Sequence, residues 1–180
     1  VMVMLLAISL GALYMINNID NKELEVKLRR WFTYSFALFL VVFLIVMFRL
    51  LMMDGYAVDS NGMISLEPHK YLHNLIEMPN VLVMLLMGAV LLVVGAAATL
   101  FKREFKRGIW LAAPGTILAV MALFMLAGYN DTAYYPSTAD IASSLTIVNS
   151  CSREFTIKTM VIVSIIIVFA VAMIAYFWRQ

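Results

Sequence analysis

The chain has 180 residues, of which 64% are hydrophobic and 13% charged, and its formal net charge is +2. With a mean hydropathy of +0.94 it lacks the polar surface of a water-soluble fold, so the composition predicts an integral membrane protein. The Lys and Arg residues fall in short clusters beside apolar runs and therefore indicate membrane topology, with no nucleic-acid partner. The one cysteine, Cys151, excludes an intramolecular disulfide and any multi-cysteine metal or iron–sulfur site.

Five apolar stretches predict an all-α integral membrane fold with five transmembrane helices, mostly in a four-helix-bundle arrangement. Residues 1–180 are interpreted as one membrane domain. Gly88, Gly95 and Gly115 are small residues at which neighbouring helices can approach closely. The expected spans are about residues 1–16, 31–53, 80–101, 108–128 and 159–178.

The first apolar stretch is short for a membrane span. As a helix, residues 1–16 reach only about 24 Å, whereas the hydrocarbon core is about 30 Å thick. The chain also begins with Val1, without the basic start and small-residue cleavage pattern of a signal peptide. We therefore expect a further part of the chain upstream, so that these residues form the C-terminal half of a longer subunit.

A charged segment follows the first stretch. Asp20 and Glu23 have the spacing of a capping box, and Glu25 and Arg29 lie four residues apart, where opposite charges pair on a helix. These features predict a short solvated helix that continues directly into the second span.

The distribution of basic residues predicts the orientation in the membrane. Lys22, Lys27, Arg29, Arg30, Lys102, Arg103, Lys106 and Arg107 lie in the connections after the first and third stretches. The loops on the opposite side contain only Lys70, Arg153 and Lys158. By the positive-inside rule, the basic loops and the C-terminus are expected in the cytoplasm, and the long loops 54–80 and 129–158 outside.

The loop over residues 54–80 contains turn signals and a short amphipathic segment. Asp54-Gly55 marks a turn, and Asn61-Gly62 makes the next segment an irregular loop or hairpin. From Pro68 the pattern predicts a short amphipathic helix at the membrane surface. Its apolar side would comprise Tyr71, Leu72, Leu75 and Ile76, and its polar side His69, Lys70, His73, Asn74 and Glu77.

The second long loop has turn and cap signals of its own, so we expect it to be ordered. Ser137 and Asp140 have the S-x-x-D form of a helix start, and Ile141, Leu145 and Val148 follow at i, i+4 and i+7. This pattern predicts a short helix folded over the mouth of the bundle, an arrangement compatible with docking on a partner subunit.

Few residues are candidates for chemistry. Arg49 is the one charge within a span. Near Asp54 it either extends to the outer interface or forms an ion pair at the outer surface, or else it has a functional role. His69 and His73 have the i,i+4 spacing of a zinc or haem site. They lie on a polar helix face and lack further ligands apart from neighbouring carboxylates, so we favour a solvated surface.

Other residue types give weaker signals. The fourteen methionines include potential haem ligands, but Met at helical spacing is more often packing material. Cys151 has no histidine near it in sequence that would activate its thiol, and no nucleophilic role is assigned to it. Tyr129, Tyr134 and Tyr135 favour an aromatic belt at the membrane interface, with quinone or lipid contact as the alternative. No catalytic, cofactor-binding or metal residue is assigned.

Three long segments resemble one known family. These are GYNDTAYYPSTADIASSLTIVNSCSREFTIKTM over residues 128–160, followed by a span ending in YFWR, LLMMDGYAVDSNGMISLEPHKYLHNLIEMPNVL over residues 50–82, and NNIDNKELEVKLRRW over residues 17–31. They resemble subunit II of the bacterial cytochrome bd-type quinol oxidase (cytochrome d ubiquinol oxidase), in its C-terminal part. The resemblance covers essentially the whole chain.

The resemblance implies a place in a respiratory complex of the bacterial inner membrane. In this family, subunit II looks like a nine-span protein that forms a heterodimer with a homologous subunit I. Subunit I is expected to hold haem b, haem d and the quinol-oxidising loop, and the complex oxidises quinol and reduces dioxygen to water in aerobic or microaerobic respiration. The family's acidic proton-path residues resemble nothing in this chain, so no catalytic residue is carried over.

The resemblance therefore predicts an accessory non-haem membrane subunit, with catalysis mainly in the partner and with lipid and quinol or quinone as further contacts. Two alternatives stay open at this point: a small secondary transporter or channel, and a purely structural membrane scaffold. A transporter is expected to have a charged or broken helix at mid-membrane, and the sequence contains neither.

Overall fold

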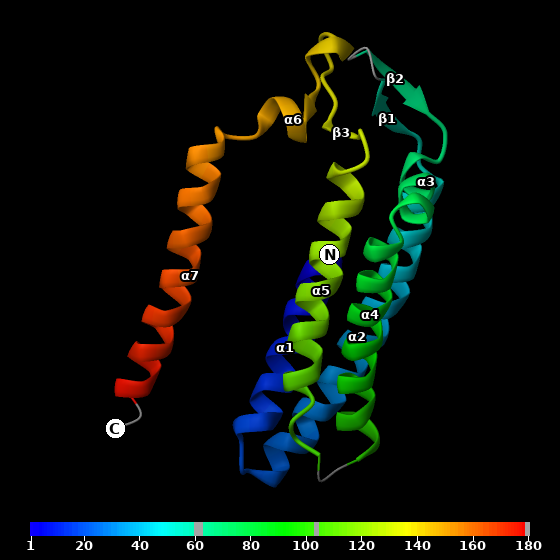
Figure 1. Cartoon of the computed structure of the whole chain (residues 1–180). Coiled ribbons are helices and arrows are strands. Elements are labelled where there is room, and N and C mark those ends of the chain that lie inside the picture. Colours follow the sequence, from blue (N-terminus) through cyan, green and yellow to red (C-terminus); the bar gives the residue numbers. More distant parts are fainter. Residues whose placement is uncertain (60–62, 103–104, 179–180) are drawn as a thin grey trace.

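The computed structural model describes residues 1–59, 63–102 and 105–178 (Figure 1). It is mostly helical, and within the described residues four helices are long and apolar enough to cross a membrane. These are α2 (Lys22–Met52), α4 (Pro79–Phe101), α5 (Ile109–Gly128) and α7 (Glu154–Phe177). A further apolar helix, α1 (Met2–Asn18), is shorter, with 17 residues. The chain is thus a helical membrane protein.

Helices α1, α2, α4 and α5 pack side by side around shared apolar contacts. One core cluster combines Leu13 and Ile16 of α1 with Phe32 and Phe36 of α2 and with residues of α4 and α5. Phenylalanine rings stack along α2, an arrangement that we call the ladder. The ring centroids of Phe32 and Phe36 are 5.4 Å apart. A second cluster lies between α4 and α5 and includes Leu126.

Glycines set the close contact between α4 and α5. A Cβ atom placed on Gly88 would lie 2.6 Å from the backbone nitrogen of Ala119 and 2.7 Å from the carbonyl oxygen of Gly115. A Cβ on Gly115 would meet the carbonyl oxygen of Gly88 at 2.7 Å. Only residues without a side chain allow the two backbones to approach this closely, as the small residues in these stretches predicted.

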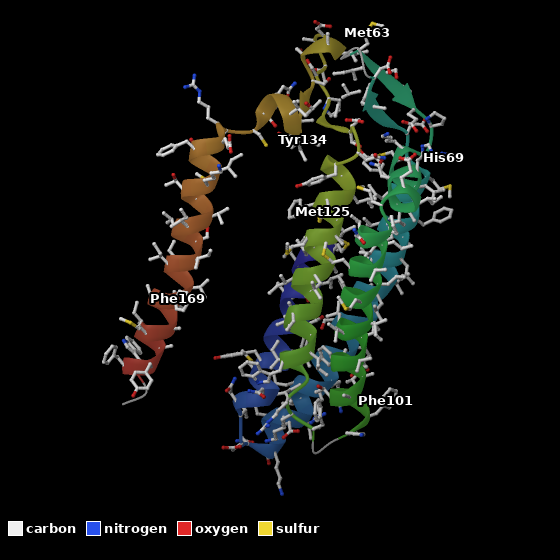
Figure 2. All side chains as sticks on the ribbon, in the orientation of Figure 1. Met63, His69, Phe101, Met125, Tyr134 and Phe169 are labelled. Carbon is white, nitrogen blue, oxygen red and sulfur yellow. The ribbon has the colours of Figure 1, made fainter. Side chains whose placement is uncertain are left out.

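Helix α7 stands apart from the other helices (Figure 1). None of its residues is buried. Figure 2 shows Phe169 on this isolated helix, and its side chain is 70% exposed. The last apolar stretch is therefore a helix whose side chains are exposed on all sides.

The charged segment after α1 continues into the second apolar stretch without interruption, as predicted, because α2 is a single helix of 31 residues. The predicted pair is also confirmed, with Glu25 Oε1 and Arg29 Nη2 2.8 Å apart. The predicted capping box is wrong by one residue. The N-cap is Asn21, and its side chain accepts hydrogen bonds from the N–H groups of Glu23 and Leu24.

Two short hairpins and a small helix gather at one end of the molecule, which we call the hairpin end (Figure 1). Strands β1 (Gly55–Val58) and β2 (Ile64–Glu67) pair antiparallel, which confirms the hairpin alternative, although Asn61-Gly62 lies outside the described residues. Helix α3 (Lys70–Glu77) follows. Strands β3 (Ala133–Tyr135) and β4 (Leu145–Thr146) form the second pair, with a bulge.

The short helix predicted from the Ser137 start signal through Val148 is wrong. The segment is divided into a 3-10 turn, η1 (Ile141–Ser143), strand β4 and a one-turn helix, α6 (Ile147–Ser150). The buried hydroxyl of Ser144 accepts from the N–H of Ser137 and donates to the carbonyl of Ile141, while Leu145 pairs with Tyr135. These bonds compete with helical ones, which explains why the apolar stripe does not become one helix.

Candidate functional site

The buried centre of the hairpin end is a polar side chain of α3. Asn74 is fully buried, and its side-chain nitrogen donates to the carbonyl of Leu126, 3.1 Å away, and to the hydroxyl of Thr132, 2.8 Å away. Its side-chain oxygen accepts from the amide of Asn130 at 3.0 Å. One asparagine thus links α3 with the end of α5 and with the turn that follows it.

That turn has an unusual backbone which places its polar groups. Asn130 and Asp131 both have positive φ, 59° and 52°, a left-handed conformation that Asn and Asp adopt more readily than most residues. The hydroxyl of Thr132 donates to the carbonyl of Tyr129 at 2.7 Å. The carbonyl of Asp131 accepts from the N–H of Val58 at 2.7 Å, so the turn also contacts the first hairpin.

A network of ion pairs and hydrogen bonds lies beside this buried centre. Glu67, at the end of β2, accepts from Lys70 Nζ at 2.9 Å, and its other oxygen lies 2.7 Å from His73 Nδ1. The second ring nitrogen of His73, Nε2, lies 3.5 Å from Glu77 Oε1. The remaining oxygen of Glu77 accepts a short hydrogen bond from the side-chain amide of Asn130. This network connects the first hairpin, α3 and the turn after α5.

This environment changes the acidity of two groups. Hydrogen bonds from Lys70 and His73, with a smaller contribution from their charges, lower the pKa of the Glu67 carboxyl, and they outweigh the opposing effect of burial. Burial raises the pKa of the Tyr71 hydroxyl. The Glu67 carboxylate is thus held in its charged form by two partners from the next helix.

The faces of α3 differ from the prediction. The polar side was expected to be solvated, yet Lys70 and Asn74 are buried, whereas Ile76 of the apolar side is 69% exposed. The reason is that β2 supplies a carboxylate for Lys70, and the turn after α5 supplies hydrogen-bonding partners for Asn74. Polar burial of this kind is stable because each group is paired.

Two cavities open at the hairpin end. One, of about 570 Å³, lies between the first hairpin and the second loop and is lined by residues such as Ile64, Tyr129 and Ile147. The other, of about 470 Å³, is more polar, and Asp59, Glu67, His73, Glu77 and Asp131 line it. The second cavity thus brings carboxylates from three segments and one imidazole to the same surface.

The two histidines do not meet as a pair. His69 Nδ1 lies 3.9 Å from Asp54 Oδ1, while His73 interacts with Glu67 and Glu77. Figure 2 shows His69 at the hairpin end. Among the described residues, no group of three or more His, Cys, Asp or Glu side chains has a geometry that could hold a metal ion.

The other residues that the sequence marked as candidates lie outside this network. Arg49 is exposed in the last turn of α2 and forms no ion pair with a described residue, since the carboxylate of Asp54 contacts His69 instead. Cys151 is exposed at the end of α6. The hydroxyl of Tyr134 donates to Ser150 within the second loop, at 2.9 Å.

A second polar cluster joins helices at the opposite end of the molecule, which we call the basic end. The Arg29 guanidinium bonds Glu25 and also makes a short hydrogen bond to the carbonyl of Thr99 in the last turn of α4. Lys106 donates to the carbonyl of Ile19 at 3.0 Å and lies 3.4 Å from Glu25 Oε2. Arg103, counted in the predicted basic connection, lies outside the described residues.

Sequence reasoning missed the residues at the centre of the hairpin end. The amphipathic pattern predicts a solvated face for Asn74, and Asn130 and Thr132 belong to the second long loop. They lie 56 and 58 residues after Asn74, and no sequence period relates them. The Asn130-Asp131 pair, a common turn former, was the one available signal.

The comparison with protein families agrees with the sequence resemblance. A family model described as cytochrome bd terminal oxidase subunit II matches residues 1–180. No curated protein matches the chain.

Proposed function

The chain belongs to the cytochrome bd terminal oxidase subunit II family, and from that premise we propose that it is the accessory, non-haem membrane subunit of a quinol oxidase that reduces dioxygen to water. The observation that carries the proposal is the family match over all 180 residues. Membership makes the chain a subunit of a respiratory quinol oxidase, which implies a complex with a partner subunit. The division of labour between the two subunits is the proposed part.

The positions of the histidines support a non-haem role. The chain has two histidines, and both lie in or next to α3 at the hairpin end, outside the apolar helices. His73 has carboxylate oxygens at both ring nitrogens, and His69 faces Asp54. Neither is placed to hold a haem between the membrane helices. We therefore assign haem b and haem d to the partner subunit and derive no redox step from this chain.

The packing supports a structural contribution within the membrane. The ladder of α2 and the glycine contact between α4 and α5 make a compact group of helices, while α7 has no buried residue. We propose that these helices complete a heterodimer and separate the haem subunit from lipid, with quinol or quinone as a candidate contact. In this proposal the hairpin end faces outward from a bacterial inner membrane, and the basic end faces the cytoplasm.

Co-purification tests the proposal. The tagged protein would be co-expressed with a haem-bearing subunit of the same oxidase family and purified in detergent. We expect both subunits in one complex, a haem absorption spectrum, and oxygen consumption driven by added quinol. Purification of the tagged chain alone, with full activity of the haem subunit in its absence, would overturn the proposal. Substrate flux into liposomes containing only this chain would instead support a transporter.

A further inference from the structure

The imidazole of His73 lies between two carboxylates on opposite sides of its ring. Nδ1 is 2.7 Å from Glu67 Oε1, and Nε2 is 3.5 Å from Glu77 Oε1. Glu67 belongs to β2 of the first hairpin, whereas Glu77 is the last residue of α3. Both ring nitrogens therefore face acceptors that donate no hydrogen bond while they are ionised.

The charged groups around His73 come from three parts of the chain. Glu67 and Asp59 approach from the first hairpin, Lys70 and Glu77 belong to α3, and Asp131 lies in the turn after α5; all of them line the same cavity of about 470 Å³. Lys70 is occupied by Glu67, 2.9 Å away, and its side chain is only 7% exposed. His73 is itself 55% exposed, so it can exchange protons with solvent.

The number of donors on the ring depends on its protonation. A neutral imidazole has one N–H and one lone pair, so it can donate to Glu67 or to Glu77 but not to both. A protonated imidazolium donates from both nitrogens and attracts both carboxylates. Histidine is the side chain that ordinarily changes its charge between about pH 5 and 8.

We propose that His73 acts as a pH-dependent latch that joins the first hairpin, α3 and the turn after α5 when it is protonated. The link reaches the turn because the other oxygen of Glu77 accepts from the side-chain amide of Asn130, which also donates to Asn74. Deprotonation leaves Glu77 facing a lone pair, so its carboxylate is held less firmly. The hydrogen bond that Glu77 accepts from Asn130, which joins α3 to the turn, therefore weakens as the pH rises. This device is additional to the proposed oxidase role and does not depend on it.

Amide hydrogen exchange tests the latch. The purified membrane protein, with any subunit that co-purifies, would be compared at pH 5.5 and pH 8 after correction for the intrinsic pH dependence of exchange. We expect protection in residues 129–135 to fall about two- to five-fold at the higher pH, as for the loss of an exposed ion pair. His73→Gln should abolish this pH dependence.

Two further variants keep the test decisive. Glu77→Gln removes the second carboxylate but retains an oxygen for Asn130, so it should also abolish the pH dependence, even if His73→Gln fails to fold. His69→Asn is the matched control, because His69 lies outside the network of contacts around His73. Asn also tolerates the left-handed φ of 53° at this position. This variant should behave like the unmodified protein. Wild-type pH dependence in Glu77→Gln, or its absence in the unmodified protein, would overturn the proposal.

Discussion

The side-chain nitrogen of Asn74 lies 2.8 Å from the hydroxyl of Thr132, which follows it by 58 residues, and both residues are buried. The same nitrogen reaches the carbonyl of Leu126 at the end of α5. A polar contact in an apolar setting is costly to leave unmade, so this pair holds α3 to the turn after α5. The two long loops consequently form one structural unit at the hairpin end.

Replacing Asn74 by Ala should destabilise this unit. The change leaves the carbonyl of Leu126, the hydroxyl of Thr132 and the amide of Asn130 with one partner fewer, and each buried group left unpaired costs about 1–3 kcal/mol. We expect a clear fall in the thermal unfolding temperature in detergent. Asn80→Ala, the same change at an exposed position, is the control and should have little effect. Equal unfolding temperatures for the two variants would contradict the assigned role of Asn74.

Adding one methyl group to Gly88 should separate α4 from α5. The new Cβ of Gly88→Ala would lie 2.6 Å from a backbone nitrogen, and backbone atoms cannot move aside as a flexible side chain can. We expect a lower unfolding temperature and a lower yield of folded protein. In Gly11→Ala the new Cβ meets no atom within 4 Å, and the higher helix propensity of Ala favours that variant by about 1 kcal/mol. We therefore predict that Gly88→Ala lowers the unfolding temperature and that Gly11→Ala raises it.

Arg29→Lys should weaken the basic end despite conserving charge. The guanidinium bonds both Glu25 and the carbonyl of Thr99, whereas an ammonium group cannot reproduce this forked geometry. Loss of one charged hydrogen bond costs about 1.5–3 kcal/mol, and thermal unfolding in detergent measures it. Arg30→Lys, at the exposed neighbouring residue, should change stability by less than about 0.5 kcal/mol. If Arg29→Lys leaves the unfolding temperature unchanged, the hydrogen bond to the carbonyl of Thr99 contributes nothing to stability.

Acid should remove the contribution of Glu67 to stability. Because Lys70 and His73 lower the pKa of this carboxyl in the folded state, the unfolded state binds its proton more readily. The stabilisation is thus complete above the ordinary pKa of 4.5 and is lost as the pH falls through the lower folded value. We expect the difference in unfolding temperature between the protein and Glu67→Gln to shrink as the pH falls below about 4.5.

The matched control for this prediction is Glu154→Gln. Glu154 pairs with Lys158 at 2.6 Å, but both side chains are largely exposed, so the pair contributes little. Its unfolding temperature should follow that of the unmodified protein at every pH. A difference for Glu67→Gln that does not change between pH 3 and pH 7 would contradict the assigned ion pairs.

Local patterns in the sequence were sufficient to predict the membrane class, the positions of the long helices and the family. Hydropathy is a local property, so residues 80–101 already predict a helix where α4 forms, and continuity of α2 followed from helix-favouring charge pairs such as Glu25 and Arg29. Long motifs such as residues 128–160 indicated the family, which the match over residues 1–180 then showed. These features depend on neighbours in sequence.

The structure of the hairpin end depends on contacts between segments that are far apart in the sequence. The amphipathic pattern predicted that Asn74 and Lys70 face solvent, but partners from β2 and from the turn after α5 satisfy them in the interior. The apolar stripe from Ile141 to Val148 predicted one helix, and Ser144 divides it by bonding Ser137 and Ile141. In both cases hydrogen-bond partners outside the local pattern offset the cost of burying polar groups, and no local period reveals where such partners lie.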